Sequence, residues 1–412
     1  MAPQALQPST IRTVKATAPV LRELGLEITR RMYERLFVNE EIKNLFNQSH
    51  HGEEGTQPRA LAGAVHAFAD NVDRLEQLAP MVERIAQKHV ALDIRPEHYP
   101  YVGEALLGAL RDVLGQAATG EVIAAWAEAY QFLADILIDR EGALYREAES
   151  APGGWSGWRE FVVDRVEPES EVITSFYLRP LDGGGVKDFA PGQYLTMAPD
   201  VPGHGRLVRN YSVSSAPGHG TYRISVKRED PPSGAPYAPP GAVSGYLHRD
   251  AVPGTVLPIR PPAGEFTLDD ETQRPLVLIS GGVGLTPLVS MLDALVDRGV
   301  QREIWFVHGA LHGRHHAMHR HVRELVAAHP NIRSVVFYEF PTPEDVPGVD
   351  YDHPGRITMD WIRDNLPVRE ADFYFCGPRG LMRMLAIGLR ALDVPDERIR
   401  FEFFGPAEAL YA

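Results

Sequence analysis

Two short turns rich in small residues are the clearest candidates for chemistry in this sequence. The apolar run 275–280 leads into residues 281–287, GGVGLTP, and Cys376-Gly377-Pro378 follows another apolar run. Glycines allow a backbone to approach a pyrophosphate, and a helix that starts there presents free N–H groups. We expect Thr286 to cap that helix and Pro287 to lie in its first turn. Either turn alone is compatible with a strand–helix connection that binds nothing, but two at the carboxyl edge of one sheet predict a nucleotide crevice.

A tetrapeptide further upstream, Arg209-Asn210-Tyr211-Ser212, combines a guanidinium, an aromatic ring and a hydroxyl group. In a strand, Arg209 and Tyr211 point to the same face. An arginine can hold a pyrophosphate through two hydrogen bonds, and a tyrosine can pack against a flavin ring. The same four residues are compatible with an ordinary surface strand, so their interpretation depends on the motifs around them.

One histidine in the N-terminal third stands where it could bind haem iron. In the segment 80–92, Val82, Ile85, Ala86 and His89 recur at helical spacing and therefore share one face. Haem iron needs an imidazole on such an apolar face, although most histidines in that position are ordinary core residues. A helical domain next to a flavin site would need a group that accepts electrons from the flavin. Cys376 is the one cysteine in the chain, which excludes an iron–sulfur cluster held by four thiolates, so haem is the leading candidate for that acceptor.

Three kinds of scaffold must position these residues. Helical periodicity covers residues 11–148, with a long loop at 47–55 and helices predicted at 20–37, 80–92, 99–114 and 122–145. After a break at 151–154, six short strands separated by turns predict an antiparallel barrel, at 161–166, 172–178, 193–198, 207–214, 222–227 and 255–259.

Strands alternate with helices in the remainder of the chain, which predicts a parallel sheet covered on both faces. These strands are expected at 276–280, 303–310, 334–340, 373–376 and 400–404. We therefore predict a multidomain protein with an all-α domain at 1–150, an antiparallel β-barrel domain at 151–268 and an α/β parallel-sheet domain at 269–412.

Composition limits the possible partners. The 412 residues include 55 acidic and 41 basic side chains, a net charge of −14, which disfavours nucleic acid and anionic membranes. The sequence has no signal-peptide pattern and no run of 18 apolar residues, so we expect a cytoplasmic protein without membrane insertion. No obligate protein partner is evident. The histidine-rich segment 312–321 could bind a metal ion, but we expect a solvated loop there.

From about residue 155 to the end, the motifs resemble the ferredoxin-reductase family of FAD and NAD(P)H modules. The matching pieces occur in family order and are Pro191-Gly192-Gln193-Tyr194, Arg209–Ser212, Val226-Lys227-Arg228, Gly241–Ser244, Gly281–Pro287, Cys376–Pro378 and Phe403-Phe404-Gly405-Pro406. The resemblance implies an FAD site formed by Tyr194, Arg209, Asn210, Tyr211, Ser212, Val226, Lys227, Gly241, Val243 and Ser244. It implies an NAD(P)H site formed by Gly282, Gly284, Thr286, Pro287, Cys376, Gly377 and Pro378. Phe404 would stack on the flavin and give way to nicotinamide, with Glu402 close to the transfer site.

The segment 85–89, together with Tyr99 and Glu141, resembles the globin domain of flavohaemoglobins, so the likeness spans essentially the whole chain. The resemblance implies that His89 binds the iron of haem b and that Tyr99 and Glu141 form hydrogen bonds behind it. On the opposite haem face it implies roles for Tyr33 as a hydrogen-bond donor to oxygen, for Phe46 as a packing residue and for Gln57 and Leu61 as the distal pair. Lys88 would face a haem propionate or the flavin domain.

The activity implied by this resemblance is nitric oxide dioxygenase. NAD(P)H reduces FAD, FAD reduces the haem iron, and haem-bound oxygen converts nitric oxide to nitrate, which detoxifies it. The partners would be nitric oxide, oxygen and NAD(P)H. No acidic or basic residue can be assigned to the ribose of the nucleotide, so the sequence does not choose between NADH and NADPH. Two departures from relatives are Leu285, in place of a polar residue, and a long Pro231–Gly241 loop.

Two other functions stay open from the sequence. The helical block could be an oxygen-binding or gas-sensing globin that its own reductase keeps ferrous. Alternatively, it could bind no haem and dock a protein partner, which would make the chain a simple flavin reductase.

Overall fold

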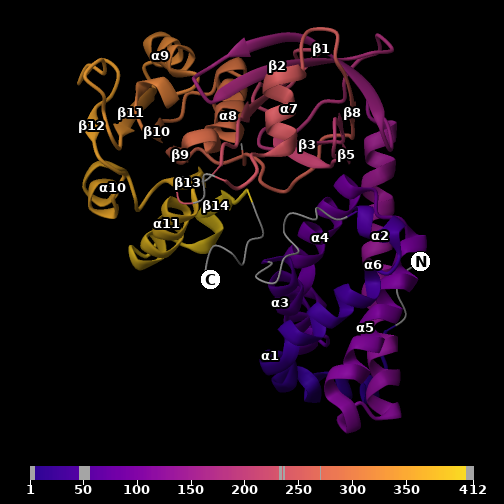
Figure 1. Cartoon of the computed structure of the whole chain (residues 1–412). Helices are drawn as coiled ribbons and strands as arrows, with labels where there is room; N and C mark the ends of the chain where they lie inside the picture. Colours follow the sequence, from indigo (N-terminus) through magenta and orange to yellow (C-terminus); the bar gives the residue numbers. More distant parts are fainter. Residues whose placement is uncertain (1–4, 46–55, 232–233, 235–236, 270, 405–412) are drawn as a thin grey trace. The chain divides into compact units, whose positions relative to one another are not determined.

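The structure is a computed structural model that describes residues 5–45, 56–231, 234, 237–269 and 271–404 (Figure 1). The chain divides after Ser150 into two compact units. The first unit contains helices, and the second contains the two large sheets. No helix in these described ranges is both long and apolar enough to cross a lipid bilayer.

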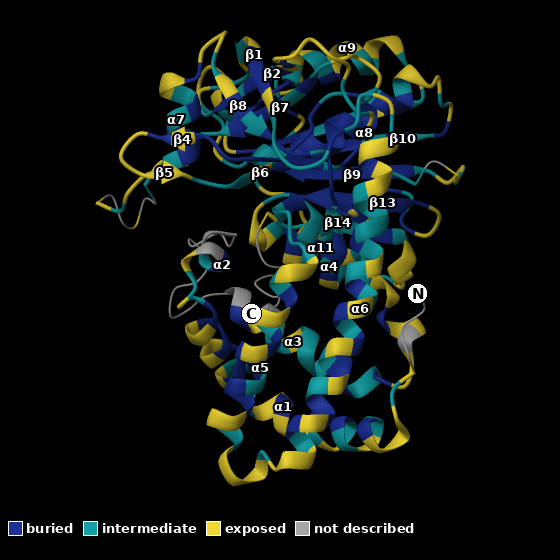
Figure 2. Cartoon of the chain, turned by 90° about the vertical axis from the view of Figure 1, so that its right-hand side faces the viewer, coloured by how far each residue is buried: buried dark blue, intermediate teal, exposed yellow. Residues whose placement is uncertain are grey.

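The first unit is all-α, as predicted. Its helices are α1 Pro8–Leu36, α2 Glu40–Leu45, α3 Thr56–Asn71, α4 Ala79–Leu92, α5 Tyr99–Leu114 and α6 Gly120–Ser150, with short 3-10 turns at Leu75–Leu78, Pro96–His98 and Gly115–Ala117. Helix α1 packs against α3, α5 and α6, and α4 packs against α6. Each long helix buries one face and exposes the other (Figure 2), which is why helical periodicity is so clear in this part of the sequence.

Two helices differ from the prediction in this unit. Helix α1 begins at Pro8, well before the expected start at residue 20, and continues through Pro19. Proline removes one backbone hydrogen bond from a helix, but Val14, Ala18 and Leu21 on either side of it are buried on one face. Helix α3 lies within the stretch 11–148 that was predicted to be helical, but its bounds were not predicted. The loop expected at 47–55 lies outside the described residues.

The second unit contains a six-stranded antiparallel sheet in the order β6-β3-β8-β1-β2-β7. Its strands are β1 Arg159–Pro168, β2 Ile173–Pro180, β3 Tyr194–Met197, β6 Arg209–Ser212, β7 Tyr222–Lys227 and β8 Val256–Ile259. The bridge between Val213 and Ile224 joins the two edge strands and closes the barrel, as predicted. The hairpin β4 Asp200–Val201 and β5 Gly205–Arg206 was not expected, and helix α7 Ala242–Asp250 stands where only a turn was expected.

The same unit contains a parallel sheet in the order β12-β11-β10-β9-β13-β14. The strands are β9 Leu276–Gly281, β10 Ile304–Ala310, β11 Ile332–Tyr338, β12 His353–Pro354, β13 Asp372–Cys376 and β14 Ile399–Glu402. Helices α8 Leu285–Asp297 and α9 His319–Ala328 lie on one side of it, and α10 Met359–Asn365 and α11 Arg379–Ala391 lie on the other (Figure 1). The strand order reverses between β9 and β13, and this reversal places the two small-residue turns side by side.

Candidate functional site

Three helices of the first unit bring His89, Tyr99 and Glu141 into one hydrogen-bond network. The Nδ1 atom of His89 lies 2.7 Å from Oε1 of Glu141, and the hydroxyl of Tyr99 donates to the same oxygen at 2.6 Å. Because a carboxylate only accepts hydrogen bonds, the N–H of Nδ1 donates the hydrogen bond to Glu141. In the neutral imidazole the other ring nitrogen, Nε2, is then an acceptor that can bind a metal ion.

Burial makes this network strong. The side chain of Glu141 is 2% exposed, whereas that of His89 is 30% exposed. A hydrogen bond to a buried carboxylate is worth more than one in water, because little solvent competes for it. Burial, followed by the hydrogen bond to Glu141, raises the pKa of Tyr99, so its hydroxyl stays protonated and remains a donor.

Close packing of α5 against α6 holds the network in place. A Cβ atom at Gly103 would lie 2.6 Å from Cε1 of Tyr130, so a larger residue there would force the helices apart. Tyr130 uses this closeness to donate its hydroxyl to the backbone oxygen of Tyr99 at 2.6 Å. Gly103 therefore helps to place the hydroxyl of Tyr99 opposite Glu141.

Of the residues expected on the haem face opposite His89, which we call the distal side, only some lie within the described residues. Tyr33 on α1 is buried, with its ring centroid 5.3 Å from that of Phe37, and burial raises its pKa so that the hydroxyl stays protonated. Leu61 on α3 packs half-buried against the core. Lys88 is exposed on α4. Phe46 and the side chain of Gln57 lie outside the described residues.

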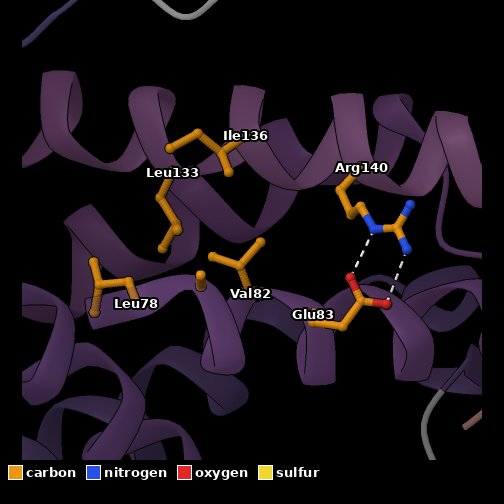
Figure 3. Close-up of a pocket in the computed structure, with 7 residues that line it drawn as sticks. Leu78, Val82, Glu83, Leu133, Ile136 and Arg140 are labelled. Carbon is orange, nitrogen blue, oxygen red and sulfur yellow. Dashed lines mark hydrogen bonds and ion pairs between the residues drawn. The ribbon is translucent and has the colours of Figure 1, made fainter. Parts of the chain in front are cut away.

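An apolar cavity of about 320 Å³ lies between α4 and α6 (Figure 3). Leu78, Val82, Leu133 and Ile136 form its walls, and the ion pair between Glu83 and Arg140, 2.7 Å long, lies at one end. His89, Tyr99 and Glu141 do not line it. The cavity therefore lies beside the histidine network along the same two helices and is separate from it.

In the barrel, the expected flavin-binding tetrapeptide forms strand β6. Arg209 is half-buried, and burial lowers the pKa of its guanidinium, which favours an anionic neighbour. Asn210 accepts a hydrogen bond from Thr196 at 2.9 Å. The hydroxyl of Ser212 is buried and has no partner among the residues that the structure describes. A buried unpartnered hydroxyl is costly, so Ser212 fits a site where a bound cofactor supplies the missing partner.

The other expected FAD residues meet at two places in the barrel. Tyr194 is buried, and burial raises its pKa. Val226 and Lys227 end strand β7, next to the N-terminus of α7. There the Ser244 hydroxyl accepts from the backbone N–H of Glu229 at 3.2 Å, and the backbone N–H of Gly241 donates to the Glu229 oxygen at 2.8 Å. Val243 is buried beneath this turn.

In the parallel-sheet domain, the two small-residue turns touch each other. A Cβ atom at Gly284 would lie 2.2 Å from the oxygen of Cys376, and one at Gly281 would lie 2.7 Å from Cδ of Pro378. Gly282 has a φ of 53°, in the left-handed region that favours glycine. The structure therefore brings the two turns together at the switch point, as their positions in the sequence predicted.

Thr286 does not cap the helix, contrary to our prediction. Helix α8 begins at Leu285, and the hydroxyl of Thr286 donates to the carbonyl of Val283 at 3.0 Å. A 3-10 turn, Gly282–Gly284, precedes the helix, whose N-cap is Gly284, two residues before the expected cap. Pro287 lies in the first turn, as expected, and Leu285 is buried in the core.

The C-terminal candidates lie at the same edge of the sheet. Glu402 is the register partner of Cys376 in the pairing of β13 with β14. Burial, followed by the charge of Glu402, raises the pKa of the Cys376 thiol, so this cysteine is a poor nucleophile. Phe404 is 48% exposed, so its ring is accessible at the end of the described chain.

The expectation of a solvated loop in the histidine-rich segment was wrong for His316, which is buried. Its ring stacks on that of His308, a β10 residue that no motif in the sequence singled out. The sequence carried no usable signal for His308, because a single histidine in a strand resembles any other core residue. Among the residues that the structure describes, no group of three or more potential ligands is arranged to hold a metal ion.

Comparison with known protein families gives two matches. The globin family matches residues 30–137, and the oxidoreductase NAD-binding domain family matches residues 278–386. The flavohaemoprotein of Halalkalibacterium halodurans is 48% identical over 412 residues, which cover 100% of this chain and 99% of that protein. The flavohaemoprotein of Bordetella parapertussis is 51% identical over 403 residues, which cover 97% and 98% of the two chains.

Solved structures show the same architecture. The flavohaemoglobin of Malassezia yamatoensis, with bound FAD and haem, superposes with a TM-score of 0.82 at 24% identity and covers 98% of this chain and 100% of that one. The FAD/NAD-binding domain of the nitric oxide dioxygenase from Vibrio cholerae is 35% identical, with a TM-score of 0.54, and covers 61% of this chain and 100% of that one.

Proposed function

The chain belongs to the flavohaemoprotein family, and we propose that it is a nitric oxide dioxygenase that uses electrons from NAD(P)H to convert nitric oxide and oxygen to nitrate. At the coarser level, it is an oxidoreductase of that family. One observation carries the finer assignment. The imidazole of His89 is hydrogen-bonded at 2.7 Å to a buried carboxylate, on the same chain as a pair of nucleotide-type turns.

The donor set around His89 fits haem b. Its Nδ1 is held by Glu141, so Nε2 is the nitrogen that would bind the iron. An imidazole that donates to a carboxylate becomes a stronger electron donor, which favours the higher oxidation states of iron needed to activate oxygen. A globin that only stored or sensed a gas would have no need of such a buried charge, so this contact favours catalysis.

The barrel and the parallel sheet fit FAD and NAD(P)H. Ser212, Arg209 and Tyr211 would hold FAD, since the buried hydroxyl lacks a protein partner and the guanidinium is desolvated. The touching turns at Gly284 and Cys376 would hold the pyrophosphate and nicotinamide ends of NAD(P)H, because they meet at the switch point of the sheet. They can touch only because Gly284 has no side chain to clash with the backbone of Cys376.

When bound, FAD and haem supply the electron transfer and the oxygen chemistry, so that two nitric oxide, two oxygen and one NAD(P)H give two nitrate, one NAD(P)⁺ and one proton. The residues of the chain position and polarise the reactants. Tyr33 keeps its proton because it is buried, and it therefore serves as a hydrogen-bond donor on the distal side. Leu61 would limit the space there, and Phe404 would cover the flavin until nicotinamide displaces it.

The proposal is tested by following nitric oxide with an electrode while purified full-length protein, supplied with haem and FAD, receives oxygen and NADH or NADPH. We expect rapid, oxygen-dependent consumption and stoichiometric nitrate. His89→Ala should abolish it but leave NAD(P)H-driven flavin reduction intact. His66→Gln, a change in a histidine of α3 that pairs with Asp70, serves as the matched control and should keep the full rate. Full activity in His89→Ala would contradict the assignment of haem to this residue.

The same assay separates the alternatives. Tight oxygen binding with slow turnover of nitric oxide would support the gas-binding globin. A yellow protein without a Soret band after haem is supplied would support the simple flavin reductase.

A further inference from the structure

Three histidine rings form a column in the parallel-sheet domain. His308 on β10 stacks on His316 with ring centroids 4.7 Å apart and an angle of 27° between the ring planes. His316 stacks in turn on His319, the first residue of α9, at 4.4 Å and 20°. His308 is 1% exposed and His316 is 7% exposed, while His319 is half-buried. The column therefore runs from the protein core towards solvent.

The inner end of the column is attached to the glycine-rich turn. Nδ1 of His308 lies 2.7 Å from the hydroxyl of Ser280, which is its register partner on β9. Ser280 immediately precedes Gly281 and Gly282 of the turn. The remaining nitrogen of His308, Nε2, is buried and has no hydrogen-bond partner in the described part of the chain. The side chain of His308 is therefore hydrogen-bonded to the residue that immediately precedes the turn.

The surroundings of the column disfavour positive charge at its inner end. The hydroxyl of Tyr338 on β11 lies 3.0 Å from Nδ1 of His316, so a neutral group faces the middle ring. Charged groups act on His319, namely Arg323 on α9 and Asp350 and Asp352, which lie before β12. Among the residues that the structure describes, the groups that shift the pKa of His308 and His316 are other histidines, and no carboxylate is among them.

These surroundings set the direction of each shift. Burial lowers the pKa of His308 to about 4, with a smaller contribution from His319. Burial lowers the pKa of His316 well below its usual value, and the two neighbouring rings lower it further. The pKa of His319 is lowered by burial and by Arg323, against the opposing effect of Asp350 and Asp352. All three rings are therefore neutral in the packed column at neutral pH.

Proton binding favours an open form of the segment in acid. A histidine released to solvent titrates at about pH 6.5, whereas the packed rings titrate lower. Some rings are neutral in the packed column and charged when released. Below about pH 6.5, each such ring raises the ratio of open to packed molecules by roughly tenfold per pH unit. The two buried rings, His308 and His316, together give roughly 100-fold at about pH 5.5, and the half-buried His319 adds to this in the same direction.

We propose that this column is an acid-sensitive switch: the stacked rings hold Ser280 and the glycine-rich turn at neutral pH, and in acid the part of residues 308–319 that follows β10 opens and uncovers the His308 ring, so that the turn loses its hold on NAD(P)H. The proposal rests on the function proposed above for this turn. In this proposal His308 and Ser280 position the turn that binds the nucleotide, and they do so without having to contact the nucleotide themselves.

The opening is measured by hydrogen exchange and mass spectrometry on the full-length protein with its cofactors. We expect the protection of peptides covering residues 308–319, corrected for the intrinsic exchange rate, to fall by more than about 100-fold between about pH 7.5 and pH 5.5, because His308 and His316 contribute about tenfold each and His319 adds to them. The protection of His319→Gln should fall less than that of the unchanged protein, by about 100-fold, because one titrating ring is lost. His204→Gln, at an exposed histidine outside the column, should behave like the unchanged protein. Equal falls in the unchanged protein and His319→Gln would overturn the proposal.

The coupling to the turn is tested with ADP-ribose, which has the pyrophosphate of NADH but no nicotinamide. At about 100 times its dissociation constant, ADP-ribose should raise the protection of residues 308–319 by about 100-fold at about pH 5.5, because it binds only the closed form. Ser280→Ala should reduce this rise while leaving the acid-induced opening in place. Binding of ADP-ribose without any rise in protection would overturn the coupling. Absence of ADP-ribose binding in calorimetry at about pH 7.5 would instead contradict the proposed NAD(P)H site.

Discussion

Gly284 lies against the backbone of Cys376 so closely that a Cβ atom on the glycine would be 2.2 Å from the cysteine carbonyl oxygen. The two residues are far apart in the sequence, yet they join the first strand of the parallel sheet to the strand beyond the reversal of order. This contact fixes the distance between the two turns that we propose hold NAD(P)H.

We predict that Gly284→Ala weakens both stability and nucleotide binding. A Cβ atom at that position meets backbone atoms, which cannot move aside as a flexible side chain can, so we expect a loss of about 1–3 kcal/mol in the free energy of unfolding. The KM for NAD(P)H should rise as the turns separate. Urea denaturation and steady-state flavin reduction measure the two effects.

Gly299→Ala, just after α8 and outside the proposed site, is the matched control. Its φ of 65° strains an alanine, but no atom lies within 4 Å of the added Cβ, so we expect a loss of about 1–2 kcal/mol from strain alone. If Gly284→Ala proved no more damaging than Gly299→Ala to the KM, the contact with Cys376 would not matter for binding.

Glu141→Gln should lower nitric oxide turnover by about 10- to 100-fold while keeping haem bound. Glutamine can still accept the Nδ1 hydrogen bond of His89, but it carries no charge, so the imidazole donates less electron density to iron. The haem midpoint potential should rise accordingly, because the ferric state loses stabilisation. Potentiometric titration and nitric oxide consumption check both effects.

Tyr99→Phe separates charge from hydrogen bonding in the same network. It removes the 2.6 Å bond to Glu141 but leaves the carboxylate opposite His89. We therefore expect a smaller shift of the haem potential than in Glu141→Gln. An equal or larger shift would show that Tyr99, and not the carboxylate charge, controls the iron.

Tyr33→Phe should shorten the retention of oxygen. The buried hydroxyl remains protonated, and the loss of one hydrogen bond to a partly charged group weakens binding by about 1.5–3 kcal/mol, or roughly tenfold or more in the dissociation rate. Tyr145→Phe, which removes a hydroxyl bonded to the Ile94 oxygen in the same unit, is the control. Stopped-flow measurement of oxygen release compares the two, and equal rates would contradict the role of Tyr33.

The second unit should lose stability as the pH falls from about 6.5 towards 4. The pKa of His308 is about 4 in the folded state and about 6.5 when unfolded, so the unfolded chain binds more protons in this interval. His308 alone should lower the free energy of unfolding by about 3 kcal/mol, and this loss should be nearly complete at about pH 4. Urea titrations at several pH values measure it. A free energy of unfolding that stayed constant across this interval would contradict the burial of a neutral His308.

Much of the fold followed from periodicity. The spacing of apolar residues identified the helix around His89, and short runs of β-branched and aromatic residues between turns identified strands such as β7. Boundaries failed where tertiary packing decided them. Helix α1 continues through Pro19 because the residues around it are buried, and this packing is not visible in local sequence.

The site was predictable only in part for the same reason. Helical spacing placed His89 on an apolar face, and the two turns predicted a nucleotide crevice. Tyr99 and Glu141, by contrast, are 10 and 52 residues from His89 and meet it only through the packing of three helices. They entered the prediction through resemblance alone. His308 had no local signal, and the histidine-rich segment that contains its stacking partners gave no sign of the stacking, because the stacking depends on contacts between strand, loop and helix.

Helix α6 carries Glu141 and ends at Ser150, after which the chain passes into the second unit. All hydrogen bonds described for His89 are to residues of that unit. A shortened gene that stops after codon 150 would therefore still encode the complete imidazole–carboxylate pair. Its product would let the optical spectrum of the porphyrin be recorded without overlapping yellow absorption, and would give spectroscopists a compact reference for the intact enzyme.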